Sequence, residues 1–172
     1  NSARKGEILY FFWFRSVVMA YLSAWNISFQ DMKKAGKNRF SFSNEMLQFQ
    51  LIQIAFCLLI MAVFNWAVML YFIAAAVIGF LLLETVNYIE LYGLTRTRNE
   101  NGRYERVRPA HSWNSNHILG RSLLFELSRH SDHHFLANRK YQTLRHMDNS
   151  PQMPTGYPGM MVLSVFPPIW FF

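Results

Sequence analysis

The sequence has a single cysteine, Cys57, and no histidine before position 111. One cysteine cannot form a disulfide within the chain, and inside an apolar run it is most simply a small buried hydrophobic residue. No secretory signal peptide, internal repeat or low-complexity linker divides the 172 residues. The length therefore suits one domain, residues 1–172.

Acidic residues are also scarce, with 10 Asp and Glu against 17 Lys and Arg. The resulting charge of +7 would suit a nucleic acid, but the aromatic residues lie in apolar runs rather than among the basic residues. We therefore expect no nucleic-acid partner. Hydrophobic residues make up 52% of the chain, which is high for a small soluble protein. The composition indicates a membrane protein whose basic residues flank the bilayer.

The longest apolar run covers residues 46–89, about twice the roughly 20 residues that one bilayer crossing needs. Its only natural break is at Phe64-Asn65-Trp66, so it predicts a hairpin of two spans, 46–64 and 67–89. The flanking segments are basic and the turn is not, so the positive-inside rule places both flanks in the cytoplasm.

The segments on either side of the hairpin differ in character. Residues 7–29 are apolar but carry Arg15, so we expect a helix lying in the membrane interface. In the C-terminal region, residues 92–172, we expect a turn at 99–102, a new segment from Pro109 and a helix over 112–127. The last four residues, Ile169 to Phe172, read as an interface anchor or a cut.

Three histidines fall within five residues at Arg129-His130-Ser131-Asp132-His133-His134. On a helix, His130 shares one side with His133 and His134, which is a spacing typical of metal ligands. Neighbouring histidines lie about 100° apart, so the pair suits two adjacent ions better than one. Asp132 is placed to orient an imidazole. A solvated histidine-rich turn is the alternative.

Other candidate residues lie on the second span and after it. Glu84 and Glu90, at its cytoplasmic end, either face a polar site or pair with Arg96 or Arg98. His117 is a weaker ligand candidate, His111 weaker still, and His146 lies in an ordinary polar stretch. Four hairpin residues are candidates for a substrate channel, although packing against lipid is their default role: Trp66, Met69, Phe72 and Phe80.

Several ordered motifs resemble the membrane-bound alkane 1-monooxygenases, the non-haem diiron alkane hydroxylases of bacteria. They are Asn87-Tyr88-Ile89-Glu90-Leu91-Tyr92-Gly93-Leu94, His111-Ser112-Trp113-Asn114-Ser115-Asn116-His117, the histidine cluster with Arg139, Tyr141 and Gln142 after it, and Pro151-Gln152-Met153-Pro154-Thr155-Gly156-Tyr157-Pro158. Weaker matches lie at Asn44-Glu45-Met46-Leu47-Gln48 and around Arg15 and Trp25.

The resemblance implies a fragment of a six-helix enzyme of the bacterial inner membrane, multi-pass, with its metal site on the cytoplasmic side. His130, His133 and His134 would bind two non-haem irons. The enzyme would take electrons from rubredoxin and use dioxygen to hydroxylate the terminal carbon of a medium-chain alkane drawn from the lipid bilayer. Glu84, Glu90, Asp132 and His117 would be supporting groups or substitute ligands.

Two departures accompany the resemblance. The family has two histidine boxes before the matched region, so we expect this chain to be a C-terminal part that cannot hold a complete diiron centre alone. The family motif has an iron-binding histidine where this chain has Leu91, and an aliphatic side chain cannot bind a metal.

Four alternatives remain open at this stage. A xylene-type hydroxylase or a fatty-acid desaturase would use the same metal class, and a degenerate paralogue would be a non-catalytic membrane module. A zinc-dependent hydrolase ranks below these. The predicted fold is all-α in every case: an integral membrane protein with an interfacial helix, a transmembrane helical hairpin and a cytoplasmic helical metal-binding region.

Overall fold

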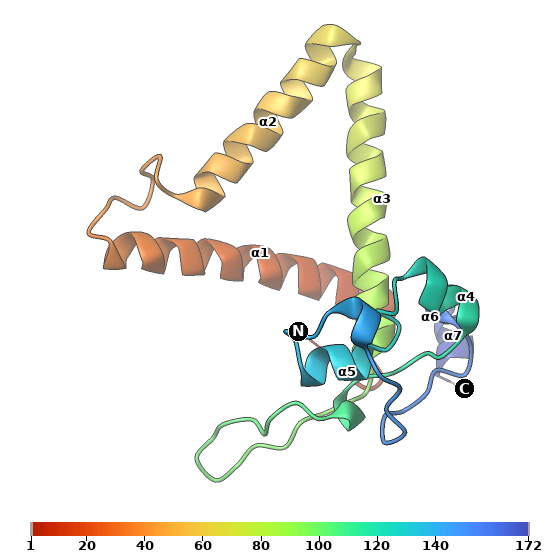
Figure 1. Ribbon diagram of the computed structural model, residues 1–172. Helices are drawn as coiled ribbons and strands as arrows, with labels where there is room; N and C mark the ends of the chain where they lie inside the picture. Colours follow the sequence, from red (N-terminus) through yellow and green to blue (C-terminus); the bar gives the residue numbers. More distant parts are fainter. Residues whose placement is uncertain (1, 172) are drawn as a thin grey trace. The chain divides into compact units, whose positions relative to one another are not determined.

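The structure is a computed structural model that describes residues 2–171 and is helical, as predicted (Figure 1). The α-helices are α1 (Leu9–Lys34), α2 (Glu45–Val63), α3 (Trp66–Leu91), α4 (Ile118–Leu123), α5 (His130–Phe135), α6 (Tyr157–Val165) and α7 (Pro167–Trp170), and the 3-10 helices are η1 (Pro109–His111) and η2 (Tyr141–Thr143). The chain divides into two compact units: unit 1 contains residues 1–13 and 83–172, and unit 2 contains residues 14–82.

Among the described residues, two helices are long and apolar enough to cross a membrane. These are α2, with a mean hydropathy of 2.1, and α3, with a mean hydropathy of 2.5. They are separated at Phe64 and Asn65, where the sequence predicted the break. Asn44 and Asn65 cap the two helices by accepting hydrogen bonds from the backbone N–H groups of Leu47 and Val68. The apolar helical hairpin indicates association with a membrane.

The helix predicted over 7–29 begins at Leu9 and continues to Lys34. Lys33 and Lys34 lie in its last turn, where positive side chains interact favourably with the helix dipole. Gly36 follows with a φ of +66°, a left-handed conformation that glycine adopts at low cost and that ends the helix. The helix thus ends where basic side chains and a left-handed glycine satisfy its C-terminus.

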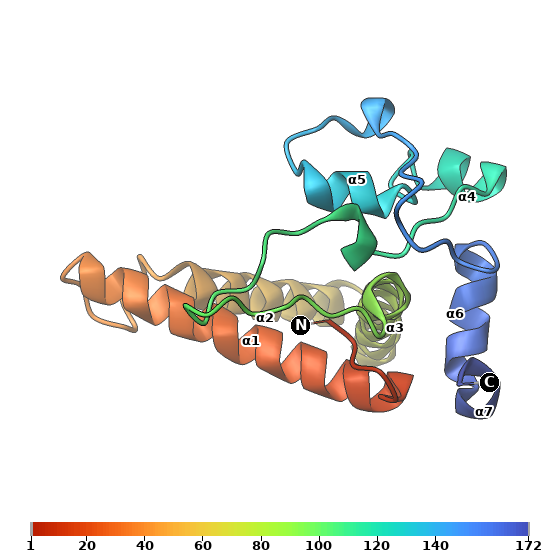
Figure 2. The same ribbon diagram turned by 90° about the horizontal axis from the view of Figure 1, so that it is seen from below.

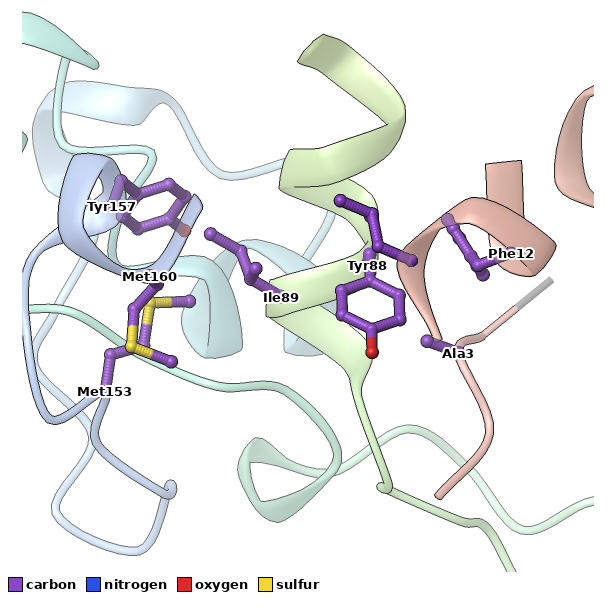
Figure 3. Close-up of a cluster of buried hydrophobic side chains, with 8 residues drawn as sticks. Ala3, Phe12, Tyr88, Ile89, Met153, Tyr157 and Met160 are labelled. Atoms are coloured by element: carbon purple, nitrogen blue, oxygen red, sulfur yellow. The ribbon is translucent and has the colours of Figure 1, made fainter. Parts of the chain in front are cut away.

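The hydrophobic core of unit 1 surrounds the C-terminal end of α3. Figure 3 shows Tyr88 directed toward Phe12 and Ala3, and Ile89 directed toward Met160 and Tyr157. The Tyr88 hydroxyl donates a 2.6 Å hydrogen bond to the Glu7 carbonyl. The last turns of α3 thus tie the start of the chain to the segment around α6.

The predicted helix over 112–127 is wrong for most of its length, because only Ile118–Leu123 is helical. Asn114 instead donates its N–H to Pro151 and accepts a hydrogen bond from the N–H of Met153, both at 2.8 Å. This pairing holds residue 114 in an isolated parallel bridge with Gln152. Long-range backbone pairing therefore overrides the helix-like apolar spacing.

The structure tests two smaller expectations for the C-terminal region. The turn at 99–102 and the new segment at Pro109 are confirmed. In the same region, the Trp170 ring packs 5.4 Å from that of Tyr88 and 5.2 Å from that of Tyr92. Figure 2 shows α7 directly after α6, and the two short helices contact each other.

Candidate metal centre

Helix α5 begins at the first histidine of the cluster and contains all three. The ring centroids of His130 and His134 are 4.3 Å apart. The ring centroid of His133 lies 6.1 Å from that of His130 and 5.8 Å from that of His134. The helix therefore groups the three imidazoles as the spacing predicted.

Buried polar contacts fix the start of α5. The Asn114 side-chain oxygen accepts a 3.2 Å hydrogen bond from the Ser131 hydroxyl, and the Ser115 N–H donates to the Ser128 carbonyl. Arg129 donates a 2.6 Å hydrogen bond to the Leu144 carbonyl. These contacts connect the histidine helix to the extended segment that also pairs with residues 151–153.

The connection from α4 to α5 includes a strained turn. Phe125 and Glu126 have positive φ values of 50° and 63°, which cost non-glycine residues energy. Arg121 binds both carboxylate oxygens of Glu126, at 2.8 and 2.9 Å, and Arg129 adds a 3.3 Å contact. The ion pairs hold the turn that leads into the histidine helix.

This turn should open at acidic pH. The hydrogen bonds from Arg121 lower the pKa of Glu126 from its ordinary value of 4.5, so the stabilisation is present above that pH and is lost as the pH falls through the lowered pKa. We expect Glu126→Gln to speed amide hydrogen exchange at residues 125–129 above pH 4.5, with a difference from the unsubstituted protein that shrinks below it. Glu100→Gln is the control, and an equal effect of both substitutions would contradict the prediction.

Glu90 lies beside His130. Its Oε2 atom is 3.1 Å from His130 Nε2, and both side chains are largely buried. The two atoms are close but not aligned for a hydrogen bond, so Nε2 lacks one within the described part of the chain. Burial, followed by the charges of His134 and His133, lowers the pKa of His130 to about 3. His130 is therefore neutral at pH 7 and has a lone pair available for a metal.

Leu91, the residue after Glu90, lines a cavity of about 580 Å³ that His111 and His134 also line. His111 is already engaged there: its Nδ1 accepts a 3.0 Å hydrogen bond from the Arg108 N–H, and its Nε2 lies 3.6 Å from a Glu105 oxygen. Positions 90 and 91 therefore face different histidines.

Asp132 is completely buried, but its hydrogen bonds within residues 2–171 go to arginines rather than to imidazoles. Arg139 Nη1 and the Arg145 N–H bind Oδ2 at 3.0 and 2.9 Å, and Arg145 Nη2 lies 3.3 Å from Oδ1. Burial opposes ionisation of this carboxyl, but the hydrogen bonds and charges of the two arginines lower its pKa overall. Asp132 thus anchors the chain after α5.

The other charged candidates lie apart from the imidazoles. His117 is exposed at the N-cap of α4, and His146 lies 3.4 Å from Asp148. One Glu84 oxygen is buried without a hydrogen bond among the described residues. Arg96 and Arg98 stack on Tyr104, at 5.3 and 4.7 Å from its ring centroid.

The four candidate channel residues all lie on α3 within unit 2. The Phe72 ring packs 5.4 Å from that of Phe56 on α2. Trp66 is 66% exposed and Phe80 is 42% exposed. Their role in substrate access stays a prediction.

Reasoning from single residues missed Asn114 and Tyr157. Tyr157 Oη donates a 2.7 Å hydrogen bond to Glu90 Oε1 across 67 positions of sequence. The resemblance drew attention to both motifs but not to these contacts.

The residues present fit part of a metal centre. The Nε2 atom of His130 is buried and without a hydrogen bond, and imidazole nitrogens suit iron. Within residues 2–171, however, no three His, Cys, Asp or Glu side chains surround one ion position. The described residues thus supply some of the ligands of such a centre.

Comparison with known proteins defines the class. The fatty acid desaturase family model matches residues 1–164, so the chain belongs to this family. Within it, the chain is 46% identical to alkane 1-monooxygenase 2 of Pseudomonas aeruginosa, over 99% of the chain and 45% of that protein. It is 42% identical to the alkane 1-monooxygenase of Acinetobacter baylyi, over 99% of the chain and 42% of that protein. The predicted resemblance is confirmed.

A more distant relative is the xylene/toluene monooxygenase hydroxylase component of Pseudomonas putida. It is 26% identical over 97% of the chain and 44% of its own length. The chain therefore spans a little under half of the length of these relatives.

Proposed function

We propose that this chain forms the C-terminal metal-binding part of a membrane alkane hydroxylase. The enzyme would hydroxylate the terminal carbon of medium-chain alkanes, using dioxygen and two non-haem irons. The observation that carries the proposal is the placement of three grouped imidazoles beside buried Glu90, at the end of an apolar helix long enough to cross a bilayer. The 40–46% identity to alkane 1-monooxygenases supports it.

The chain's own residues would have distinct tasks. His130, His133 and His134 would donate nitrogen lone pairs to iron, and the neutral state of His130 means that it need not lose a proton first. Iron would supply the activation of dioxygen that an inert C–H bond requires. Glu90, near the C-terminal end of α3, would place a carboxylate oxygen beside His130 Nε2, and Asp132 would fix the following segment through Arg139 and Arg145. The apolar hairpin would let an alkane approach from the bilayer.

Electrons would come from rubredoxin. The segment 96–108 carries five arginines and two glutamates, and all five arginines are exposed. An acidic electron carrier would be attracted to this excess of positive charge. The site would lie on the cytoplasmic side of the bacterial inner membrane, because the basic flanks of the hairpin favour that side.

Product analysis tests the proposal. We expect the natural full-length protein containing this chain to convert octane to 1-octanol when given dioxygen, rubredoxin and its reductase. His133→Ala should lower this turnover by at least about 100-fold, since it removes a proposed ligand. His146→Ala is the matched control, because His146 lies outside the imidazole group, and it should keep most of the activity.

Other products would point to other members of the class. A benzylic alcohol from xylene, with octane untouched, would indicate a xylene-type hydroxylase. An alkene from a fatty acyl chain would indicate a desaturase. Iron-free protein without any of these products would identify a degenerate paralogue, and each of these results would contradict the proposal.

A further inference from the structure

Tyr157 begins α6 and is hydrogen-bonded to Glu90 at the candidate centre. Its side chain is 3% exposed, and its hydroxyl donates a 2.7 Å hydrogen bond to Glu90 Oε1. The second oxygen of the same carboxylate, Oε2, is the atom that lies 3.1 Å from His130 Nε2. One carboxylate thus joins a tyrosine on α6 to a histidine on α5.

This arrangement restricts the rotation of the Glu90 carboxylate. With Oε1 held by the Tyr157 hydroxyl, Oε2 is held toward the imidazole. Burial, the charge of Glu90 and the hydrogen bond to it all raise the pKa of Tyr157, so the hydroxyl keeps its proton and stays a donor. A hydrogen bond from a neutral hydroxyl to a buried carboxylate is stronger than one between neutral groups.

The start of α6 is itself held in place. Met160 packs in the same core cluster as Ile89, the residue next to Glu90 (Figure 3). A Cβ atom at position 159 would lie 2.6 Å from Thr155 Oγ1, so the Thr155 side chain packs directly against Gly159. Tyr157 therefore reaches Glu90 from a closely packed helix start rather than from a loose tail.

We propose that Tyr157 is a positioning residue for the metal centre, acting through Glu90 on His130. The proposal rests on the proposed function, because it assigns His130 to a metal. Glu90 Oε2 lies beside Nε2, the nitrogen whose lone pair is available to a metal, so the carboxylate and the imidazole would face the same ion. A group that hydrogen-bonds a carboxylate at a metal site affects the affinity of that site. Tyr157 makes no hydrogen bond to an imidazole within residues 2–171, so removing its hydroxyl should act only through the carboxylate.

The test measures metal release rather than turnover. The natural full-length protein is loaded with iron(II), and the rate at which a chelator removes the metal is followed by absorbance. We expect Tyr157→Phe to release iron about 10-fold to 100-fold faster, the range typical for loss of an outer partner of a metal ligand. Tyr141→Phe is the matched control, because Tyr141 is exposed and its ring contact with Phe125 would survive.

A double-mutant cycle separates positioning from general loosening of the fold. In a Glu90→Ala background, Tyr157→Phe should change the release rate by less than about twofold, because the group through which it acts is gone. If Tyr157→Phe speeds iron release by the same factor with and without Glu90→Ala, the proposal is overturned. It is also overturned if Tyr157→Phe and Tyr141→Phe release iron at the same rate. If the unsubstituted protein binds no iron, the proposed function itself fails, which is a distinguishable result.

Discussion

Replacing Leu91 with histidine is expected to raise the iron content of the purified full-length protein and to slow iron loss to a chelator. Leu91 lines the same cavity as His134, so an imidazole at position 91 would face that histidine. The added nitrogen donor should slow the release of iron by roughly 10-fold to 100-fold. Loss of an outer partner of a metal ligand changes metal binding by the same range. The measurement is iron per chain after purification in detergent, followed by the rate of chelation.

The control for this change is Leu91→Phe, which fills the same part of the cavity without adding a metal-binding atom. It should leave iron content and release unchanged or make them worse. Two irons per chain with Leu91 in place, and the same release rate after Leu91→His, would mean that another group already serves this position. If the unsubstituted protein contains no iron and Leu91→His restores it, Leu91 identifies the protein as an inactive member of the family.

Asp132→Asn is expected to lower the free energy of unfolding by about 1.5–3 kcal/mol, the range for hydrogen bonds to a charged group. The carboxylate is completely buried and interacts with Arg139 and Arg145, and the substitution would leave both arginines beside a neutral amide. This expected loss of stability is smaller than the 3–5 kcal/mol typical of a broken buried ion pair, because the Arg145 side chain is 55% exposed and screened by water.

The loss of stability should be visible as a lower denaturant midpoint in detergent, with faster hydrogen exchange at residues 130–146. Asp148→Asn provides the comparison, because the Asp148 side chain is 94% exposed and should contribute almost nothing. Equal midpoints for the two variants would show that the arginine contacts are not stabilising. If iron loss is the only defect of Asp132→Asn, the carboxylate orients an imidazole instead.

Local patterns in the sequence predicted the long helices well. The apolar run and its break near Asn65 gave α2 and α3 to within two residues at each end, because membrane-length helices depend on continuous hydrophobicity. The histidine cluster was likewise correctly placed on one helix. The same approach failed over 112–127, where the periodicity was helical but the backbone of Asn114 pairs with residues 151–153.

In the candidate site too, contacts within one helix were predictable from the sequence and contacts between distant segments were not. Residue type and spacing identified His130, His133 and His134, because their grouping depends only on one turn of helix. The neighbours of these histidines come from distant segments: Glu90 from α3 and Tyr157 from α6. Asp132 shows the opposite effect, since a carboxylate beside two imidazoles in sequence is directed to arginines in the fold.

By itself, the sequence determined the all-helical character, the apolar hairpin and the histidine spacing. These features follow from hydrophobicity and from the period of the helix, which act over a few neighbouring residues. Only the tertiary structure decided that Glu90 faces His130, that Leu91 faces the cavity beside His134, and that Tyr157 holds Glu90. Such contacts depend on how segments far apart in the chain pack and pair their buried polar groups, which no local pattern encodes.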